Sequence, residues 1–191
     1  MLTGGVIAAI MAAVPRMFAQ AAVLLPAPYR SSKYVAPPDA GWDIIVAGRD
    51  EPGDRFVVTG RALDDGAPVA NVSIYVFHVD AEGFYSRDGL NSDENARLFG
   101  TLRTDQRGRY RYETIRPSGY GELSAHVHQV INASGYKPRL FDLWLGDDPI
   151  LARNRASGRN LPPAEWIRAV TRDTNGVWHA EHDVEMIRDS N

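Results

Sequence analysis

Two histidines separated by one residue are the part of the sequence best suited to chemistry. His126 and His128 flank Val127 in a run of strand-forming residues, His126–Ile131. Residues two apart on a strand point to the same face, so both imidazoles can reach one metal ion. Taken alone, the pattern is weak, because two half-exposed strand histidines would look the same. It indicates a metal site only if further ligands lie nearby.

Two tyrosines can supply those ligands. Tyr120 stands six residues before His126 in an irregular loop, and Tyr85 follows the turn at Gly83. Two phenolates and two imidazoles form a hard, anionic set that favours Fe(III) over softer or divalent ions. A phenol has an ordinary pKa of about 10, so it ionises at neutral pH only beside a strong positive charge such as a trivalent cation. We therefore predict an Fe(III) site with Tyr85, Tyr120, His126 and His128 as ligands.

The elements that must position these residues are predicted to be short strands. Runs of β-branched and aromatic residues between Gly and Asp turns predict strands at 56–63, 69–79, 98–104, 110–115, 126–131, 140–145 and 177–186. A helix is expected at 162–170, where Pro163 suits the first turn. Many short strands with little helix indicate an all-β sandwich.

Composition limits the other functions. The chain has 191 residues, of which 44% are hydrophobic and 24% charged, as expected for one globular domain. Its formal charge of −3 does not suggest a nucleic-acid or anionic-membrane surface. The absence of cysteine rules out disulfides, thiolate metal sites and cysteine nucleophiles.

The first residues are typical of a secretory signal. An uncharged apolar run at 6–14 is followed by Ala19-Gln20-Ala21, and it is too short for a membrane span. We expect a signal peptide at 1–21, a linker or strap at 22–52 and the β-sandwich domain at 53–191, with no membrane span in the mature chain. Export to the periplasm or medium is expected, and Met1–Gly5 resembles the stretch after the paired arginines of a twin-arginine signal. A buried N-terminal helix is the alternative.

Several segments together resemble one enzyme family. They are Gly60–Asp64 with Gly66–Val69, Val79–Tyr85, Arg103–Tyr110, Thr114–Tyr120, Ala125–His128 and Gly146–Pro149. Their order resembles the core of the intradiol aromatic-ring dioxygenases over roughly residues 53–186. The resemblance implies a β-sandwich with ferric iron, which opens a catecholic ring with O2 to a muconate-type diacid. It also implies that Tyr85 and His128 are equatorial ligands, that Tyr120 and His126 are axial, and that a substrate displaces Tyr120. Family members commonly form homo-oligomers.

The chain departs from the family pattern around the expected substrate pocket. Leu123 stands where the family usually has an arginine, three residues before the first metal histidine. The spacing from Tyr120 to His126 is also short, and the segment 139–143 reads Arg-Leu-Phe-Asp-Leu where a glutamine is usual. Arg116 or Arg139 could supply the missing cation, and Arg116 is predicted to act in catalysis together with Tyr120.

Other histidines and arginines have simpler interpretations. His78 is expected to be packed and hydrogen-bonded within a central strand. His179 and His182 are three apart, which puts them on opposite faces of a strand, and we expect a solvated edge there. The arginine-rich stretch 152–160 is expected to be an exposed loop.

Two other protein classes remain as alternatives. A cupin also has an H-x-H motif, but its motif adds a glutamate four or five residues on, where this chain has Asn132 and Ala133. A non-enzymatic secreted β-sandwich binding module of the transthyretin-like kind would explain the fold and Leu123, with the tyrosines as core aromatics. It would leave four iron-type ligands in the family's order unexplained.

Overall fold

The computed structural model describes residues 27–87 and 91–189, and within them the chain forms two β-sheets. The first sheet has the order β1 (Asp43–Ile45), β6 (Arg109–Ile115), β2 (Arg55–Asp64), β12 (Trp178–Glu181) and β11 (Thr171–Arg172), and β3 (Ala67–Pro68) and β13 (Val184–Glu185) also pair with β2. The second has the order β10 (Ile167–Arg168), β9 (Leu143–Leu145), β7 (His126–Asn132), β4 (Ser73–His78) and β5 (Leu98–Arg103), and β8 (Arg139–Leu140) pairs with β7. The expected signal peptide lies outside the described residues.

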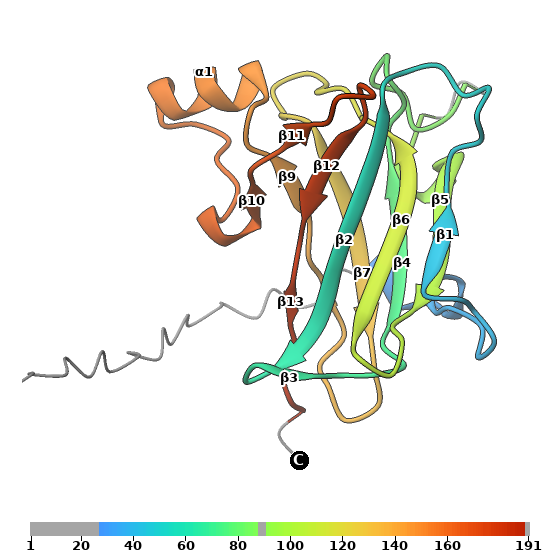
Figure 1. Ribbon diagram of the computed structural model, residues 1–191. Coiled ribbons are helices and arrows are strands. Elements are labelled where there is room, and N and C mark those ends of the chain that lie inside the picture. Colours follow the sequence, from blue (N-terminus) through green and yellow to red (C-terminus); the bar gives the residue numbers. More distant parts are fainter. Residues whose placement is uncertain (1–26, 88–90, 190–191) are drawn as a thin grey trace, which may run out of the picture.

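The two sheets pack face to face, as Figure 1 shows for β2 and β6 in front of β7 and β4. Strand alternation explains the core between them, because every second side chain points inward. Val58 and Tyr112 from the first sheet meet Ile74, Val127 and Leu143 from the second, and all five are fully buried. The prediction of an all-β sandwich is confirmed.

The outer face of the second sheet is covered by the segment that precedes the first strand. Two 3-10 turns, Ala27–Arg30 and Ser32–Tyr34, place Tyr29 and Tyr34 against Tyr75 and Phe77 of β4. Further along the chain, β1 joins the first sheet beside β6. The segment expected to be a linker or strap thus contributes both a sheet strand and an aromatic cover.

The helix prediction at 162–170 is wrong. That segment holds only the 3-10 turn Ala164–Trp166, and the α-helix α1 spans Pro149–Ser157. The side chain of Asp148 caps this helix by accepting from the N–H groups of Ile150 and Leu151, and Gly158 ends it with a φ of 68°. The stretch expected to be an exposed loop is therefore largely helical, and Asn154 within it is buried.

The last strands also differ in detail from the prediction. Trp178–Glu181 and Val184–Glu185 are separate strands, and the side chain of His182 between them points into the core, where it is fully buried. Its Nδ1 bonds with Oε1 of Gln129 at 2.9 Å, so the solvated edge expected here is wrong for His182. His179 is half-buried, with a side chain that is 42% exposed, and it contacts Asp173. Among the described residues, no helix is long and apolar enough to cross a membrane.

Candidate metal centre

Strand β7 presents His126 and His128 on the outer face of the second sheet, since Val127 between them is buried in the core. Trp144 lies opposite His126 in β9, and Phe77 lies opposite His128 in β4. Each aromatic ring stacks on its imidazole, with ring centroids 4.2 Å apart for Trp144 and 4.6 Å apart for Phe77. The strand register therefore fixes the plane of both imidazoles.

The hydrogen bonds of the two histidines determine their tautomers. Nδ1 of His126 lies 2.7 Å from the carbonyl oxygen of Ser124, and Nδ1 of His128 lies 2.9 Å from Oδ1 of Asp142. A carbonyl or carboxylate oxygen only accepts, so each Nδ1 has the proton. Both Nε2 atoms then present lone pairs, 3.1 Å from each other. These two lone pairs repel each other, and a cation bound between the two Nε2 atoms would remove this repulsion.

The two tyrosine hydroxyls complete this cluster. Oη of Tyr85 lies 2.9 Å from Nε2 of His128 and 2.8 Å from Oη of Tyr120. Oxygen and nitrogen ligands bind an ion such as Zn²⁺ at about 2.0–2.2 Å, so two adjacent ligands of one ion lie about 3 Å apart. Neighbouring donor atoms in the series Tyr120, Tyr85, His128, His126 therefore have the spacing expected of adjacent ligands of one ion.

Burial keeps Tyr85, Tyr120 and His126 neutral in the absence of an ion. It raises the pKa of the Tyr85 hydroxyl well above its usual value, and the hydrogen bond with Tyr120 adds to this effect. Burial also raises the pKa of Tyr120. The pKa of His126 is lowered to about 4 by burial and by the neighbouring His128. Phenolates form in such a place only with a highly charged cation, so the residues present fit ferric iron.

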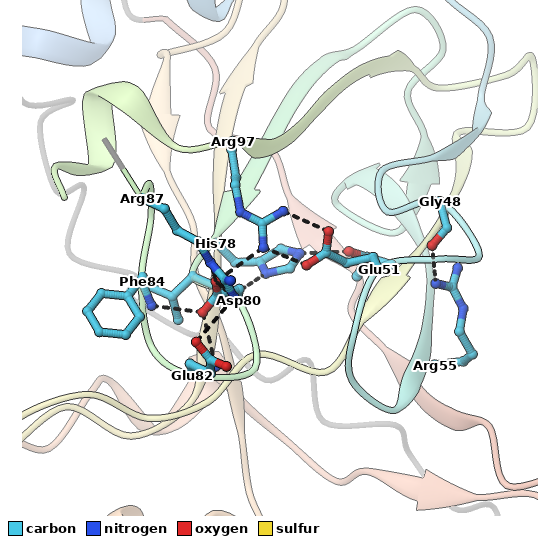
Figure 2. A network of polar contacts seen from close by, with 11 residues as sticks. Gly48, Glu51, Arg55, His78, Asp80, Glu82, Phe84, Arg87 and Arg97 are labelled. Atoms are coloured by element: carbon cyan, nitrogen blue, oxygen red, sulfur yellow. Dashed lines mark hydrogen bonds and ion pairs between the residues drawn. The ribbon is translucent and has the colours of Figure 1, made fainter. Parts of the chain in front are cut away.

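The turn before Tyr85 is held by a buried carboxylate (Figure 2). Asp80 has a side chain that is 2% exposed, and its Oδ1 accepts from the N–H groups of Glu82 and Phe84 at 3.0 Å each. Its Oδ2 pairs with Arg87 at 3.2 Å and with Arg97 at 3.1 Å. These four contacts fix the chain directly before the first tyrosine of the cluster.

Gly83 allows the two tyrosine loops to pack together. Its φ of 90° lies in the left-handed region, and a Cβ at this position would lie 3.2 Å from Cβ of Tyr120. The second loop is also tied to the first, because the N–H of Ser118 donates to the carbonyl oxygen of Asp80. Tyr120 and Leu123 exchange two backbone hydrogen bonds, of 3.0 and 2.9 Å, which close the turn before β7.

The two arginines proposed as replacements for the missing cation lie elsewhere. Nη2 of Arg116 donates to Asp147 at 2.7 Å, and its guanidinium stacks on Trp178, 4.4 Å from the ring centroid. Arg139 is buried over the ring of Phe141 on the core side of the sheet, and burial lowers its pKa to about 10. Within the described residues, no contact of Arg116 reaches the four donor side chains, so the geometry gives its predicted catalytic role no support.

Sequence reasoning missed the two groups that orient the histidines. The Ser124 acceptor is a backbone carbonyl, which no residue type reveals. Asp142 was noted only as part of the segment that lacks the usual glutamine. It lies between β8 and β9, both of which pair with β7, and this pairing is seen only in the folded sheet.

Fold and cluster together define a class: a β-sandwich with a cluster of two tyrosines and two histidines on the outer face of one sheet. The family described as Dioxygenase matches residues 26–160 of the chain. The chain belongs to the intradiol ring-cleavage dioxygenase family.

Curated relatives agree with this assignment. The catechol 1,2-dioxygenase of Acinetobacter baylyi is 27% identical over 60% of this chain and 43% of its own length. The hydroxyquinol 1,2-dioxygenase of a Rhizobium species is 27% identical over 73% of this chain and 57% of its own. The protocatechuate 3,4-dioxygenase beta chain of Burkholderia cepacia is 32% identical over 67% of this chain and 61% of its own length. This chain thus spans 43–61% of the length of these three relatives.

Solved structures share the fold. The catechol 1,2-dioxygenase of Acinetobacter sp. ADP1, inhibited by bound mercury, superposes with a TM-score of 0.67 and 21% identity, over 82% of this chain and 60% of that one. The dioxygenase domain of a dioxygenase and carbohydrate-binding fusion from Streptomyces sp. SirexAA-E has a TM-score of 0.63 and 19% identity, over 81% of this chain and 94% of that domain. At these identities the likeness concerns the fold alone.

Proposed function

We propose that the protein is a non-haem Fe(III) dioxygenase that opens a catecholic ring with O2 to give a muconate-type diacid. The observation that supports this most is the spacing of four donor atoms, 2.8, 2.9 and 3.1 Å from one to the next, on side chains from three separate segments. The names of the curated relatives agree with a catecholic substrate, and they differ among themselves in its substituents.

Each of the four side chains has a distinct task in this proposal. His126 and His128 give neutral nitrogen ligands whose free lone pairs are fixed by the hydrogen bonds at Nδ1. Tyr85 is buried and gives a permanent phenolate. Bound ferric iron would supply a Lewis acid that lowers the pKa of the substrate hydroxyls.

Tyr120 is the ligand proposed to give way to the substrate. Its side chain is only partly buried and comes from the loop between β6 and β7. Burial raises the pKa of its hydroxyl, so Tyr120 Oη would hold a proton whenever it does not contact a cation. Tyr120 Oη is therefore placed to receive a proton from an entering catechol hydroxyl, within a cluster whose other members stay fixed.

The test is a turnover assay on the iron-loaded protein. Catechol, hydroxyquinol and protocatechuate are supplied separately with O2, and O2 uptake is compared with the formation of the ring-opened acid. We expect one molecule of diacid per O2 consumed with at least one substrate, and none from His128→Ala. Iron-loaded protein that cleaves none of the three would contradict the proposal and favour the binding-module alternative.

A further inference from the structure

Asp142 occupies a position that the strand pairing fixes opposite His128. On one side of it β8 pairs Leu140 with Val130, and on the other β9 pairs Leu143 with Val127. The short gap between β8 and β9 therefore lies against the middle of β7. The carboxylate is brought to the outer face of the sheet, where its Oδ1 lies 2.9 Å from Nδ1 of His128.

The surroundings of this pair favour a strong interaction. The side chain of Asp142 is 6% exposed and that of His128 is 12% exposed, so water competes little for the bond. A hydrogen bond to an ionised acceptor is shorter and about twice as strong as one between neutral groups. The acceptor for the other histidine, His126, is the neutral carbonyl of Ser124. The two imidazoles thus have unlike partners.

We propose that Asp142 is a positioning residue that orients His128 and makes it the stronger of the two imidazole ligands. A carboxylate on the distal nitrogen of a metal-bound histidine fixes its tautomer and raises its basicity. Asp142 thereby adds negative charge beside this centre and stabilises its ferric state. The inference rests on the proposed function, because it requires iron at the cluster.

The experiment compares the wild-type protein with Asp142→Asn and Asp142→Ala. The asparagine keeps an acceptor oxygen but removes the charge, and the alanine removes both. Asp173→Asn is the matched control, because Asp173 contacts His179 at 3.0 Å on an exposed part of the other sheet. Three properties are measured on each: ferric affinity against a chelator, the wavelength of the phenolate-to-iron absorption, and the Fe(III)/Fe(II) potential. Circular dichroism checks that each variant is folded.

We expect Asp142→Ala to weaken ferric binding by about 10–100-fold. The absorption should move to longer wavelength and the potential should rise, because a weaker nitrogen donor leaves the iron poorer in electrons. Asp142→Asn should shift both in the same direction with a smaller loss of affinity, and Asp173→Asn should match the wild type. Folded Asp142 variants with wild-type absorption, potential and affinity would overturn this inference alone. A wild-type protein that binds no ferric iron would overturn the proposed function as well.

Discussion

Tyr85 and Tyr120 differ in how firmly the surrounding chain holds them. The N–H of Tyr85 donates to Oδ1 of Asn91 at 2.8 Å, its carbonyl accepts from the N–H of Arg97 at 2.9 Å, and its side chain is buried. Tyr120 is held by its turn with Leu123 and is partly exposed. At the scale of single residues, the cluster therefore combines one buried phenol with one that is partly exposed.

This difference predicts unequal effects of removing each hydroxyl. Tyr85→Phe should weaken ferric binding more than Tyr120→Phe, because the Tyr85 hydroxyl hydrogen-bonds with both His128 and Tyr120. Both variants should lose part of the phenolate-to-iron absorption. Titration with ferric iron, followed by visible absorption, measures both effects. Tyr136→Phe, which removes a surface hydroxyl bonded to Asp64, is the control and should behave as the wild type.

Leu123 gives a second prediction at this scale. It stands three residues before His126, its side chain is 36% exposed, and the family usually has an arginine there. Loss of a preorganised charge of this kind costs about 10²–10³ in rate. Leu123→Arg should therefore raise kcat for a catecholic substrate by up to about that factor. Glu122→Arg, one residue earlier and exposed, is the control; an equal gain in both variants would contradict a specific role for position 123.

At the scale of elements, strand alternation was the part of the structure that the sequence predicted well. The runs from Phe56 and from Tyr110, and the run that contains Val127, form β2, β6 and β7. Helix α1 was missed because it has no apolar stripe, although its ends had readable signals. Asp148 and Pro149 start it and Gly158 ends it, as helix-capping rules favour.

The four predicted ligands lie in one cluster because β7 carries both histidines and the two loops that carry the tyrosines pack beside it. The hydrogen bonds around them could not be predicted in the same way. Asp142 reaches His128 only because β8 and β9 both pair with β7, and that pairing is a property of the folded sheet. Arg116, which is predicted to act in catalysis, contacts Asp147 and Trp178.

The turn held by Asp80 gives a prediction at the scale of elements. Asp80→Ala would leave two N–H groups and the guanidinium of Arg97 without this acceptor. We expect a loss of about 3 kcal/mol in the free energy of unfolding, at the low end for a buried ion pair because Arg97 is partly exposed. Ferric affinity should fall too, since Tyr85 follows this turn. Urea unfolding and iron titration check the two effects. Asp105→Ala is the control for ferric affinity, because Asp105 holds the turn between β5 and β6 in the same way.

The pKa of Asp80 determines the pH below which its carboxylate no longer stabilises the fold. Burial alone would raise its pKa, but hydrogen bonds from Phe84 and Arg97 outweigh burial and hold the pKa below its usual value. A carboxylate with a lowered pKa in the folded state stabilises the protein above its unfolded pKa of about 3.9. This contribution should therefore disappear only as the pH falls below about 4.

At the scale of the whole molecule, buried histidines make the stability of the fold depend on pH. His78 is 1% exposed in β4, and its ring nitrogens bond with Thr114 and with the carbonyl of Val79. Burial lowers its pKa from 6.5 to about 4. The prediction of a packed, hydrogen-bonded histidine is confirmed. His182 has a lowered pKa for the same reason, which is burial.

A depressed histidine pKa makes stability depend on pH. Between pH 6.5 and 4 the unfolded chain binds a proton at His78 that the folded chain does not, so stability is full above this range and falls as the pH drops through it. The shift corresponds to roughly 3 kcal/mol. His78→Gln should lower stability at neutral pH yet flatten this fall, as measured by urea unfolding at several pH values. If the free energy of unfolding of the variant fell between pH 6.5 and 4 as steeply as that of the wild type, the role given to His78 would be contradicted.

The most direct test of the central claim is the visible spectrum of the purified protein during titration with ferric iron, followed by anaerobic addition of catechol. If Tyr85, Tyr120, His126 and His128 hold the metal, the protein should bind one iron per chain and develop a phenolate-to-iron absorption. That absorption should move to longer wavelength when catechol binds. A protein that stays colourless and takes up no ferric iron would show that the cluster is not an iron site.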